Sequence, residues 1–418
     1  MPLPKSTEMS CPTSVKIDAI APKQAAKILE ALRVGIPPAG YLEFFTVGRN
    51  DQIERLNSHL TGGGGYALLL KANYGSGKSH LLQMIREKAV ATQFATSLVI
   101  LDANSGVRFN RMDQILGAIL QNLRIDNNGG SSNGLARTLD FLADSAERAK
   151  SNSNTKSYRF WAEVTNNWKW DSSAKLMSPA LFVAFRAWAA TKSQPVRDLI
   201  IDWLSFPANY RTQRKKLYRA LVSDLNTHFR DPRSDYQIYS DGVVSFHTSQ
   251  YKSCWNALED INQMCSAAGL KGMVILFDEF EDVLTNINNI NHKEAAFGNL
   301  FRFVSGDPFT GKTFYAVTPS FIQRCVNLLI TNNRWNFDYG QFDNLETFEM
   351  SPLSEQNLLD LAERIAAVHE RAYSYNITPN TKAKIKRKVI EAAKSVVQDR
   401  ARQAIKQAVG VLDDDLPK

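Results

Sequence analysis

Short apolar runs that alternate with helical patterns are the main structural signal in this sequence. Runs of strand length lie at residues 66–71, 97–104, 273–277, 312–318 and 344–350. The segments between them carry apolar residues at helical spacing. Strands that alternate with helices in this way predict an α/β fold with a five-stranded parallel sheet.

Helices are predicted before, between and after these strands. Residues 18–35 and 79–90 have helical spacing. After the fifth strand, a serine cap at position 351 or 354 begins a long amphipathic helix, and residues 381–412 predict one or two more helices before an acidic tail. The sheet is therefore expected to be followed by a helical lid. The apolar stripe of the long helix consists of Leu358, Leu361, Ile365 and Val368.

The middle of the chain gives a weaker signal. A helix predicted over residues 111–124 runs into a glycine- and asparagine-rich stretch at 126–134, which is expected to be a flexible loop. From there to residue 268 the pattern is mainly helical. Tryptophans in this part are expected to form the core of a helical subdomain, although such rings also stack on nucleic-acid bases. They are Trp161, Trp168, Trp170, Trp188 and Trp203.

These patterns, over a length of 418 residues, predict how the chain is divided. Residues 1–45 are expected to form a helical lead-in. Residues 46–126 and 256–350 are expected to form the α/β core, and a mainly helical insertion at 127–255 interrupts it. Residues 351–418 are expected to form the lid.

The composition is that of an ordinary soluble protein, with 44% hydrophobic and 22% charged residues. No apolar run approaches the roughly 18 residues of a membrane span, and the first residues lack the apolar middle of a secretion signal. The four cysteines, at positions 11, 254, 265 and 325, show no paired short spacing, so neither disulfides nor a zinc site is expected. These features fit a protein of the reducing cytoplasm.

Positive charge is concentrated in two segments, within a formal net charge of +8. Residues 211–219 contain five cations and no acid, and residues 382–406 contain nine Lys or Arg against Glu391 and Asp399. Clusters of this kind neutralise phosphates in proteins that bind DNA. A solvated helix face has the same composition, so the charge alone leaves both interpretations open.

The stretch after the first strand has the chemistry of a phosphate-binding loop. Polyphosphate oxygens need several backbone N–H donors that point to one place, and Gly75 and Gly77 supply the backbone conformations that this requires. Lys78 is expected to bridge the outer phosphates, and the Ser79 hydroxyl is expected to bind Mg²⁺. Ala72 stands where the pattern has its first glycine, which is tolerable if φ is negative there. The alternative is a tight strand-to-helix turn that binds nothing.

Two acids follow the apolar strand at 273–277. The carboxyl ends of strands are where α/β sheets place ligand sites. Asp278 is expected to hold Mg²⁺, directly or through water, as a Walker B acid does. Glu279 is suited to orient and deprotonate a water, which favours hydrolysis over transfer to a substrate hydroxyl. Glu281 and Asp282 are expected to begin the next helix, without catalytic work.

Thr318 ends the strand at 312–318 and precedes Pro319. A polar residue at this place is known as sensor 1 when its side chain reaches the attacking water or the γ-phosphate. The sequence Thr-Pro-Ser is also typical of a helix N-cap followed by a first-turn proline. The two roles are compatible.

The order of these motifs resembles that of the AAA+ and STAND-like ATPases. More narrowly, "EALRVGIPPAGYLEFFTVGRNDQIERL", "NYGSGKSHLL", "VILFDEFEDVL" and "AVTPSFIQR" are similar to the ATP-binding domain of phage-defence systems of the BREX type. The resemblance covers most of the chain and is weakest from 127 to 255. It implies an ASCE-type P-loop NTPase fold with ATP and Mg²⁺ as cofactors.

The resemblance also implies roles for single residues. Val47, Gly48 and Arg49 form the edge of the adenine pocket in this assignment. The cofactor-binding loop consists of Asn73, Tyr74, Gly75, Ser76, Gly77, Lys78, Ser79 and His80. The residues assigned to phosphate binding, magnesium binding and hydrolysis are Lys78, Ser79, Asp278, Glu279 and Thr318.

Two arginine roles stay open at this point. An arginine finger neutralises the charge that develops on the γ-phosphate, and Arg324 and Arg334 are the candidates. Either would act on a neighbouring subunit, which implies a homo-oligomer. A lid arginine that completes the site is either Arg402 or Arg400.

Three functions compete. The leading one is a Mg²⁺-dependent ATPase that acts as an oligomerising switch or motor, with protein partners, in a DNA-directed defence or remodelling system. The second is a STAND-type signalling ATPase that acts only through protein partners. The third is a small-molecule kinase with residues 127–268 as its acceptor domain, which Glu279 and the long lid argue against. Stimulation of turnover by DNA separates the first two.

Overall fold

The structure of the protein is a computed structural model that describes residues 17–63, 65–127, 130–151, 155–166, 175–205, 251–394 and 400–416. The chain divides into two compact units. The helical unit lies within Met1–Glu54, Asn73–Met84 and Ser351–Lys418. The sheet unit lies within Arg55–Ala72 and Ile85–Met350. The finer division into lead-in, core, insertion and lid stays a prediction.

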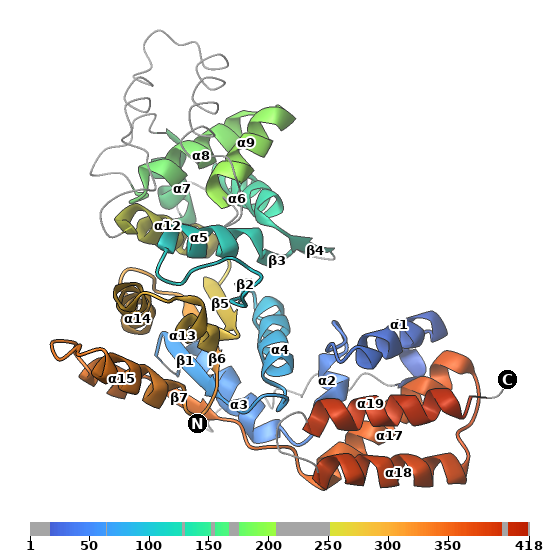
Figure 1. Cartoon of the computed structure of the whole chain (residues 1–418). Helices are drawn as coiled ribbons and strands as arrows, with labels where there is room; N and C mark the ends of the chain where they lie inside the picture. Colours follow the sequence, from blue (N-terminus) through green and yellow to red (C-terminus); the bar gives the residue numbers. More distant parts are fainter. Residues whose placement is uncertain are drawn as a thin grey trace, which may run out of the picture. The chain divides into compact units, whose positions relative to one another are not determined.

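The sheet unit contains one sheet with the strand order β4-β3-β2-β5-β6-β1-β7 (Figure 1). Five of its strands pair in parallel, and they are the five that the apolar runs predict. The chain is thus a mixed α/β protein with a mostly parallel sheet, as expected. The parallel strands are β1 (Ala67–Lys71), β2 (Ala95–Ile100), β5 (Met273–Asp278), β6 (Lys312–Val317) and β7 (Thr347–Glu349).

The predicted number of five strands is wrong, because the sheet has 7 strands. β3 (Leu123–Asn127) pairs antiparallel with β2, and β4 (Gly130–Asn133) pairs antiparallel with β3. The helix predicted over 111–124 is therefore shorter, α5 (Met112–Gln121), and the stretch predicted to be a flexible loop contributes strand residues. Glycine and asparagine are as typical of hairpin turns as of loops, so composition did not separate the two.

The parallel register brings several strand ends to one edge of the sheet. Lys71 of β1 pairs with Val317 of β6, and Phe277 of β5 pairs with Tyr315 of β6. The amide of Ala72 donates to the Val317 carbonyl at 3.0 Å, which extends the β1–β6 ladder by one residue. Parallel strands point the same way, so the residues that follow β1, β5 and β6 leave the sheet at the same edge.

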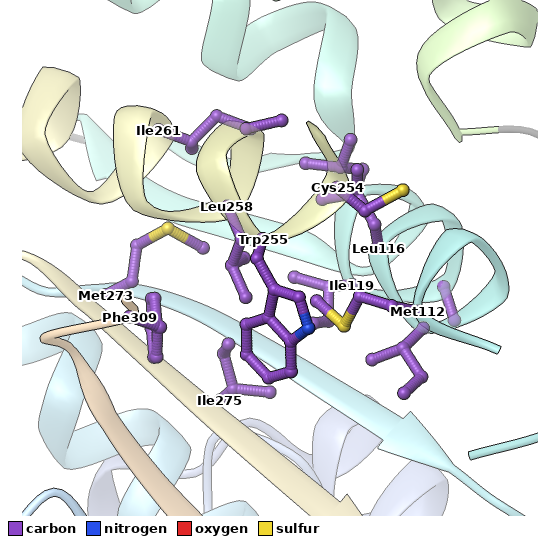
Figure 2. Packing of buried hydrophobic residues seen from close by; sticks show 14 of the residues in the cluster. Met112, Leu116, Ile119, Cys254, Trp255, Leu258, Ile261, Met273, Ile275 and Phe309 are labelled. Atoms are coloured by element: carbon purple, nitrogen blue, oxygen red, sulfur yellow. The ribbon is translucent and has the colours of Figure 1, made fainter. Parts of the chain in front are cut away.

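The core of the sheet unit is built around Trp255, which is 1% exposed. Figure 2 shows its indole lying between Ile275 of β5 and side chains of α5, among them Met112 and Ile119. Trp255 belongs to α12 (Lys252–Ala267), so this side chain packs a helix from late in the chain against an early helix and the sheet. A buried aromatic side chain of this size contributes much of the apolar area that stabilises such a core.

Helices of the middle segment extend this core. Trp161, Trp188 and Trp203 are buried in it, which confirms the expected packing role for these three, whereas Trp168 and Trp170 lie outside the described residues. The helices are α6 (Leu135–Ala149), α7 (Lys156–Asn166), α8 (Pro179–Ala190) and α9 (Gln194–Ser205). Cys254, Cys265 and Cys325 are buried and form no disulfide among the described residues, and Cys11 lies outside the described residues.

A buried carboxylate joins α8 to α12. Both oxygens of Asp260 accept backbone N–H groups at the start of α8, from Met177 at 2.9 Å and from Ser178 at 2.7 Å. These N–H groups precede a helix and have no partner within it. Burial raises the pKa of Asp260 to about 7, and the two hydrogen bonds oppose that shift. Asp260 therefore fixes the position of α8 on the core.

Four further helices of the described residues follow β5 and β6 in the sheet unit. They are α13 (Val283–Asn286), α14 (Ile290–Ser305), α15 (Phe321–Thr331) and α16 (Gly340–Asp343). Two helices pass from one unit to the other along the chain, α3 (Asn50–Ser58) and α4 (Lys78–Ala91).

The helical unit has a core of its own. Three C-terminal helices lie side by side (Figure 1), and α1 and α2 pack on the first of them. The stripe predicted for that helix is buried at all four positions, and the Ser354 hydroxyl accepts the Asn357 amide at 3.1 Å, so Ser354 is the cap. The helices are α1 (Pro22–Arg33), α2 (Leu42–Phe45), α17 (Glu355–Tyr373), α18 (Pro379–Lys394) and α19 (Arg400–Asp414).

One polar network ties three of these helices together. Arg33 of α1 donates to both oxygens of Asp413 on α19, at 2.8 and 2.7 Å. His369 of α17 is fully buried, and its Nε2 lies 3.1 Å from Asp413 while its Nδ1 lies 2.9 Å from the Tyr375 hydroxyl. The Arg33 guanidinium lowers the pKa of Asp413, and burial lowers the pKa of His369 despite the nearby carboxylate.

The lowered pKa of His369 predicts that acid weakens the helical unit. The folded state binds this proton less readily than the unfolded chain, so the stabilisation is complete above about pH 6.5 and is lost as pH falls below it. Asp413 stays ionised down to its own lowered pKa and is unchanged in this window. Hydrogen exchange in α17 and α19 should accelerate between pH 7.5 and pH 5, after correction for intrinsic rates. His369→Gln should reduce that pH dependence, and an equal dependence in both proteins would contradict the assignment.

Candidate functional site

The loop between β1 and α4 has the backbone that its glycines predict. Gly75 has a φ of 69° and Gly77 a φ of 94°, in the region that favours glycine. The Ser76 amide and hydroxyl both donate to the Asn73 carbonyl, at 3.3 and 2.6 Å. Ala72 is buried and has no positive φ, so an alanine is tolerated at this point. The loop is therefore a tight, internally bonded turn that leads directly into α4.

Lys78 is the first residue of α4 and is only 8% exposed. Its ammonium lies 4.7 Å from the centroid of the Tyr74 ring, within reach of a cation–π interaction. Ser79, one residue on, is exposed. The N-terminus of a helix offers unpaired N–H groups and the positive end of its dipole, which together attract anions. The loop thus combines a cation, a hydroxyl and a helix N-terminus.

Residues 46–49 pack directly against this loop within the helical unit. The Thr46 hydroxyl lies 2.8 Å from Nε2 of His80. Arg49 is 7% exposed, and its Nη2 donates to the Ser76 carbonyl at 3.1 Å. Burial, together with the Arg49 charge, lowers the pKa of His80 to about 4, so this imidazole is neutral near pH 7. Val47, between these two contacts, is buried.

Gly48 has no room for a side chain. Its φ is 59°, and a Cβ at this position would lie 2.4 Å from Nδ2 of Asn357 in α17. Segment 46–49 is therefore held between the phosphate loop and α17. The assignment of Val47, Gly48 and Arg49 to an adenine pocket stays a prediction.

The acids of the sheet unit gather at the end of β5. Asp278 is the last strand residue and is buried, and its Oδ1 accepts the Glu279 amide at 2.9 Å. Glu279 has a φ of 53°, which is uncommon for a residue with a side chain and which turns the chain sharply out of the strand. Partial burial raises the pKa of Glu279, and the charges of Asp278, Asp282, Asp102 and Glu281 raise it further.

Thr318 lies directly after β6, the strand next to β5, and is 8% exposed. Its Oγ1 is buried and has no hydrogen-bond partner among the described residues. A buried hydroxyl without a partner costs free energy, so it is the exception among buried polar groups and points to a ligand or water at this place. The alternative role as a helix cap receives no support, because α15 begins at Phe321 and its N-cap position is Ser320.

The candidate arginines lie in different surroundings. Arg324 of α15 is exposed, and its charge opposes the rise in the pKa of Asp282 that burial causes. Arg334 forms an ion pair with Glu294, with Nε 3.4 Å from Oε1, and also bonds to Asn291. Arg402 of α19 is exposed, and its Cγ would lie 3.4 Å from a Cβ built at Gly35.

A comparison with known families decides which proteins this chain is related to. The family model described as "BREX system ATP-binding protein BrxC/D" matches residues 20–169 and 249–414. This chain belongs to that family. The match breaks between these ranges, where the sequence motifs are also weakest. No curated protein and no solved structure matches the chain.

Membership in the BrxC/D family indicates an ATP-binding protein of a phage-defence system. The phosphate loop lies in the helical unit, and Asp278 lies in the sheet unit. Over the described ranges, no group of three or more His, Cys, Asp or Glu side chains has the arrangement of a metal site. Mg²⁺ bound with a nucleotide needs only one or two protein ligands, because phosphates and waters supply the rest. A serine hydroxyl and a carboxylate, as in Ser79 and Asp278, are oxygen ligands of the kind that Mg²⁺ takes.

Sequence reasoning missed two neighbours of the predicted residues. The charge of Asp102 raises the pKa of Glu279, and the side chain of Asn357 lies against Gly48. Both are far along the chain from the motif beside which they lie, so no local pattern could have found them. Asp282 belongs to the quoted acidic segment and was expected only to begin the next helix, whereas its charge also raises the pKa of Glu279. No described helix has both the length and the apolar character that crossing a membrane requires.

The unpartnered Thr318 hydroxyl predicts a separation of stability from activity. Thr318→Val keeps the shape and removes a group that makes no hydrogen bond among the described residues, so the unfolding temperature should be unchanged or slightly higher. If the Thr318 hydroxyl contacts the attacking water or the γ-phosphate, ATP turnover should fall by about tenfold or more, because a positioned polar group is lost.

A matched control lies on β6, the strand that Thr318 follows. Thr313 is also buried, and its Oγ1 donates to the Tyr66 carbonyl at 3.1 Å. Thr313→Val should lower stability by about 1 kcal/mol and leave turnover per folded molecule unchanged. A Thr318→Val protein that is destabilised like Thr313→Val, with normal turnover, would show that Thr318 is structural.

Proposed function

We propose that this BrxC/D-family protein is an ASCE-type P-loop NTPase that hydrolyses ATP with Mg²⁺. The observation that carries this proposal is the order of the strand ends in the sheet. β6 lies between β5 and β1. One sheet edge thus carries Asp278, Thr318 and the entrance to the phosphate loop, which follows β1 directly. Ligand sites of α/β sheets lie at such an edge.

Nucleotide binding falls to the phosphate loop. The loop amides and the start of α4 are suited to the β- and γ-phosphates, and Lys78 to bridging the outer two. Binding requires Lys78 to exchange its contact with the Tyr74 ring for phosphate oxygens. Ser79 and Asp278 are the residues to hold Mg²⁺, which when bound neutralises charge on the phosphates.

Hydrolysis falls to Glu279 and Thr318. A carboxylate with a raised pKa is a better proton acceptor near neutral pH than an ordinary one, and burial together with the four acids around it raises the pKa of Glu279. Glu279 takes a proton from the attacking water, and the Thr318 hydroxyl orients that water or the γ-phosphate. A kinase would need the hydroxyl of a substrate, as acceptor of the phosphoryl group, at the place where Glu279 is suited to hold water. The proposal of hydrolysis is therefore preferred to the kinase alternative.

The arginine finger that the family resemblance implies is Arg324 in this proposal. Arg334 is engaged by Glu294 and Asn291 of its own chain, whereas Arg324 is exposed. A finger supplied to a neighbouring copy makes hydrolysis depend on oligomer formation. The protein then acts as an oligomerising switch or motor.

DNA is the second partner that we propose, and α18 offers the surface. Of the cations on this helix, Lys384 pairs with Asp415 at 3.0 Å and Lys388 with Glu391 at 3.1 Å. Lys382 and Lys386 are exposed one helical turn apart. They are the better candidates for phosphate contacts. The other basic segment, 211–219, lies outside the described residues.

Replacement of the proposed base tests the hydrolysis. Glu279→Gln should bind ATP and lower its turnover by about a hundredfold or more, because general-base catalysis is lost. Asp282→Asn is the comparison variant: it removes an acid that raises the pKa of Glu279 but leaves the base in place, so turnover should fall far less. Turnover is measured as phosphate release, and binding by equilibrium dialysis with labelled ATP. Equal turnover in Glu279→Gln and the parent would refute the role of Glu279.

A salt series tests the contact with DNA. If Lys382 and Lys386 each contact a phosphate, replacing both by Gln should reduce the dependence of log affinity on log salt by up to about 1.8, the value for two contacts. All DNA sequences should be affected alike, since phosphate contacts carry no base information. Lys23 and Lys27, exposed one turn apart on α1, form the matched control pair. An equal effect of both pairs, or none, would favour the STAND-type switch that contacts protein only.

A further inference from the structure

Arg49 is a buried cation whose hydrogen bonds go to uncharged groups. Its Nη1 donates to Oε1 of Gln52 at 2.7 Å and to the Ser351 carbonyl at 2.6 Å, and its Nη2 donates to the Ser76 carbonyl at 3.1 Å. Burial lowers its pKa, and no carboxylate among the described residues pairs with it. A buried charge without a counter-ion is costly, so its position requires a reason.

Both carbonyls that Arg49 binds belong to functionally placed segments. Ser76 lies in the phosphate loop, between the two glycines that shape it. Ser351 is the first residue of the C-terminal segment and lies three positions before Ser354, the cap of α17. One planar guanidinium therefore links the backbone of the phosphate loop to the backbone that leads into the C-terminal helices.

A second set of contacts runs in parallel with this link. Nη1 of Arg364, in α17, donates to the Phe44 carbonyl at 2.5 Å and to the Thr46 carbonyl at 3.2 Å. The hydroxyl of Thr46 in turn contacts His80 at the start of α4. Segment 44–49 is thus held by α17 on one side and holds the phosphate loop on the other. All of these residues lie in the helical unit.

We propose that Arg49 is a positioning residue that couples the phosphate loop to α17. The part of this inference that concerns nucleotide rests on the proposed ATP binding. Phosphates that bind to the loop amides fix the loop and with it the Ser76 carbonyl. Arg49 passes that restraint to Ser351, and its charge beneath the loop adds attraction for the phosphates. Lysine cannot replace it, because a single ammonium does not span two carbonyls and a side-chain amide in a fixed fork.

The first experiment needs no nucleotide. Hydrogen exchange is measured in the full-length parent and in Arg49→Lys. The variant should exchange about tenfold faster or more in two places at once, residues 73–79 and residues 351–354, because hydrogen bonds from a charged donor are lost at both. Arg33→Lys, which breaks the bond to Asp413 in the same unit, should accelerate α1 and α19 and leave residues 73–79 unchanged.

Arg364→Lys tests the same coupling from the other side. Arg364 has no hydrogen bond to the phosphate loop, yet its replacement should accelerate exchange in residues 73–79 through segment 44–49. The Arg364→Lys variant also tests the coupling if the Arg49→Lys variant does not fold. Unchanged loop exchange in Arg364→Lys, or acceleration in Arg49→Lys that is confined to the loop, would overturn the coupling.

ATPγS with Mg²⁺ then tests the part that involves nucleotide. In the parent, residues 73–79 and α17 should become protected with the same midpoint in ATPγS concentration. At saturating ATPγS, Arg49→Lys should keep protection in the loop and lose it in α17. Protection of the loop alone in the parent would overturn the inference. No protection anywhere, with no ATPγS bound in dialysis, would refute the proposed function, while the experiments without nucleotide still decide the coupling.

Discussion

The chain must reverse direction between the end of β1 at Lys71 and the start of α4 at Lys78, and it does so with left-handed backbone at Gly75 and Gly77. Any side chain at these two positions strains the turn. The turn decides where Lys78 begins its helix and where the Ser76 carbonyl points. The contact from Arg49 to that carbonyl, and hence the packing of segment 46–49, depends on it. A local backbone requirement of two residues thus organises contacts made by residues far away in the sequence.

The sheet imposes a second constraint, of charge rather than shape. β5 ends in Asp278, and the left-handed turn at Glu279 keeps several acids close together at that edge. Crowded carboxylates repel one another, and each raises the pKa of its neighbours. Such an edge is unfavourable alone and becomes favourable when cations approach it. Metal cations and the side chains of lysine and arginine reduce the repulsion between these carboxylates.

Much of the fold could be predicted from the sequence because the relevant forces are local. The five parallel strands follow from apolar runs, and the buried stripe of α17 follows from helical spacing. The β3–β4 hairpin could not be predicted, since glycine and asparagine satisfy a loop and a hairpin equally. The sequence offered Ser351 and Ser354 as the cap of α17, and only the structure shows that the cap is Ser354.

The candidate site residues also include some that the sequence predicts and some that only the structure reveals. Gly75, Gly77, Lys78 and Asp278 are recognisable because each motif is contiguous. Tertiary contacts join residues that are far apart in the sequence. Arg49 and Ser351 are 302 positions apart, and Arg334, which follows α15, pairs with Glu294 of α14. Burial raises the pKa of Glu279, and one of the acids that raise it further is Asp102, which follows β2 and lies outside the acidic segment.

The hairpin also changes what the sheet presents to other molecules. Without it, β2 would form an edge, and a regular apolar edge strand of six residues is a template on which other chains can pair. β4 occupies that edge instead, with four residues of glycine, serine and asparagine, and β7 closes the opposite edge with three. Short polar strands are poor templates. Growth of the sheet by strand addition is thereby disfavoured at both of its described edges.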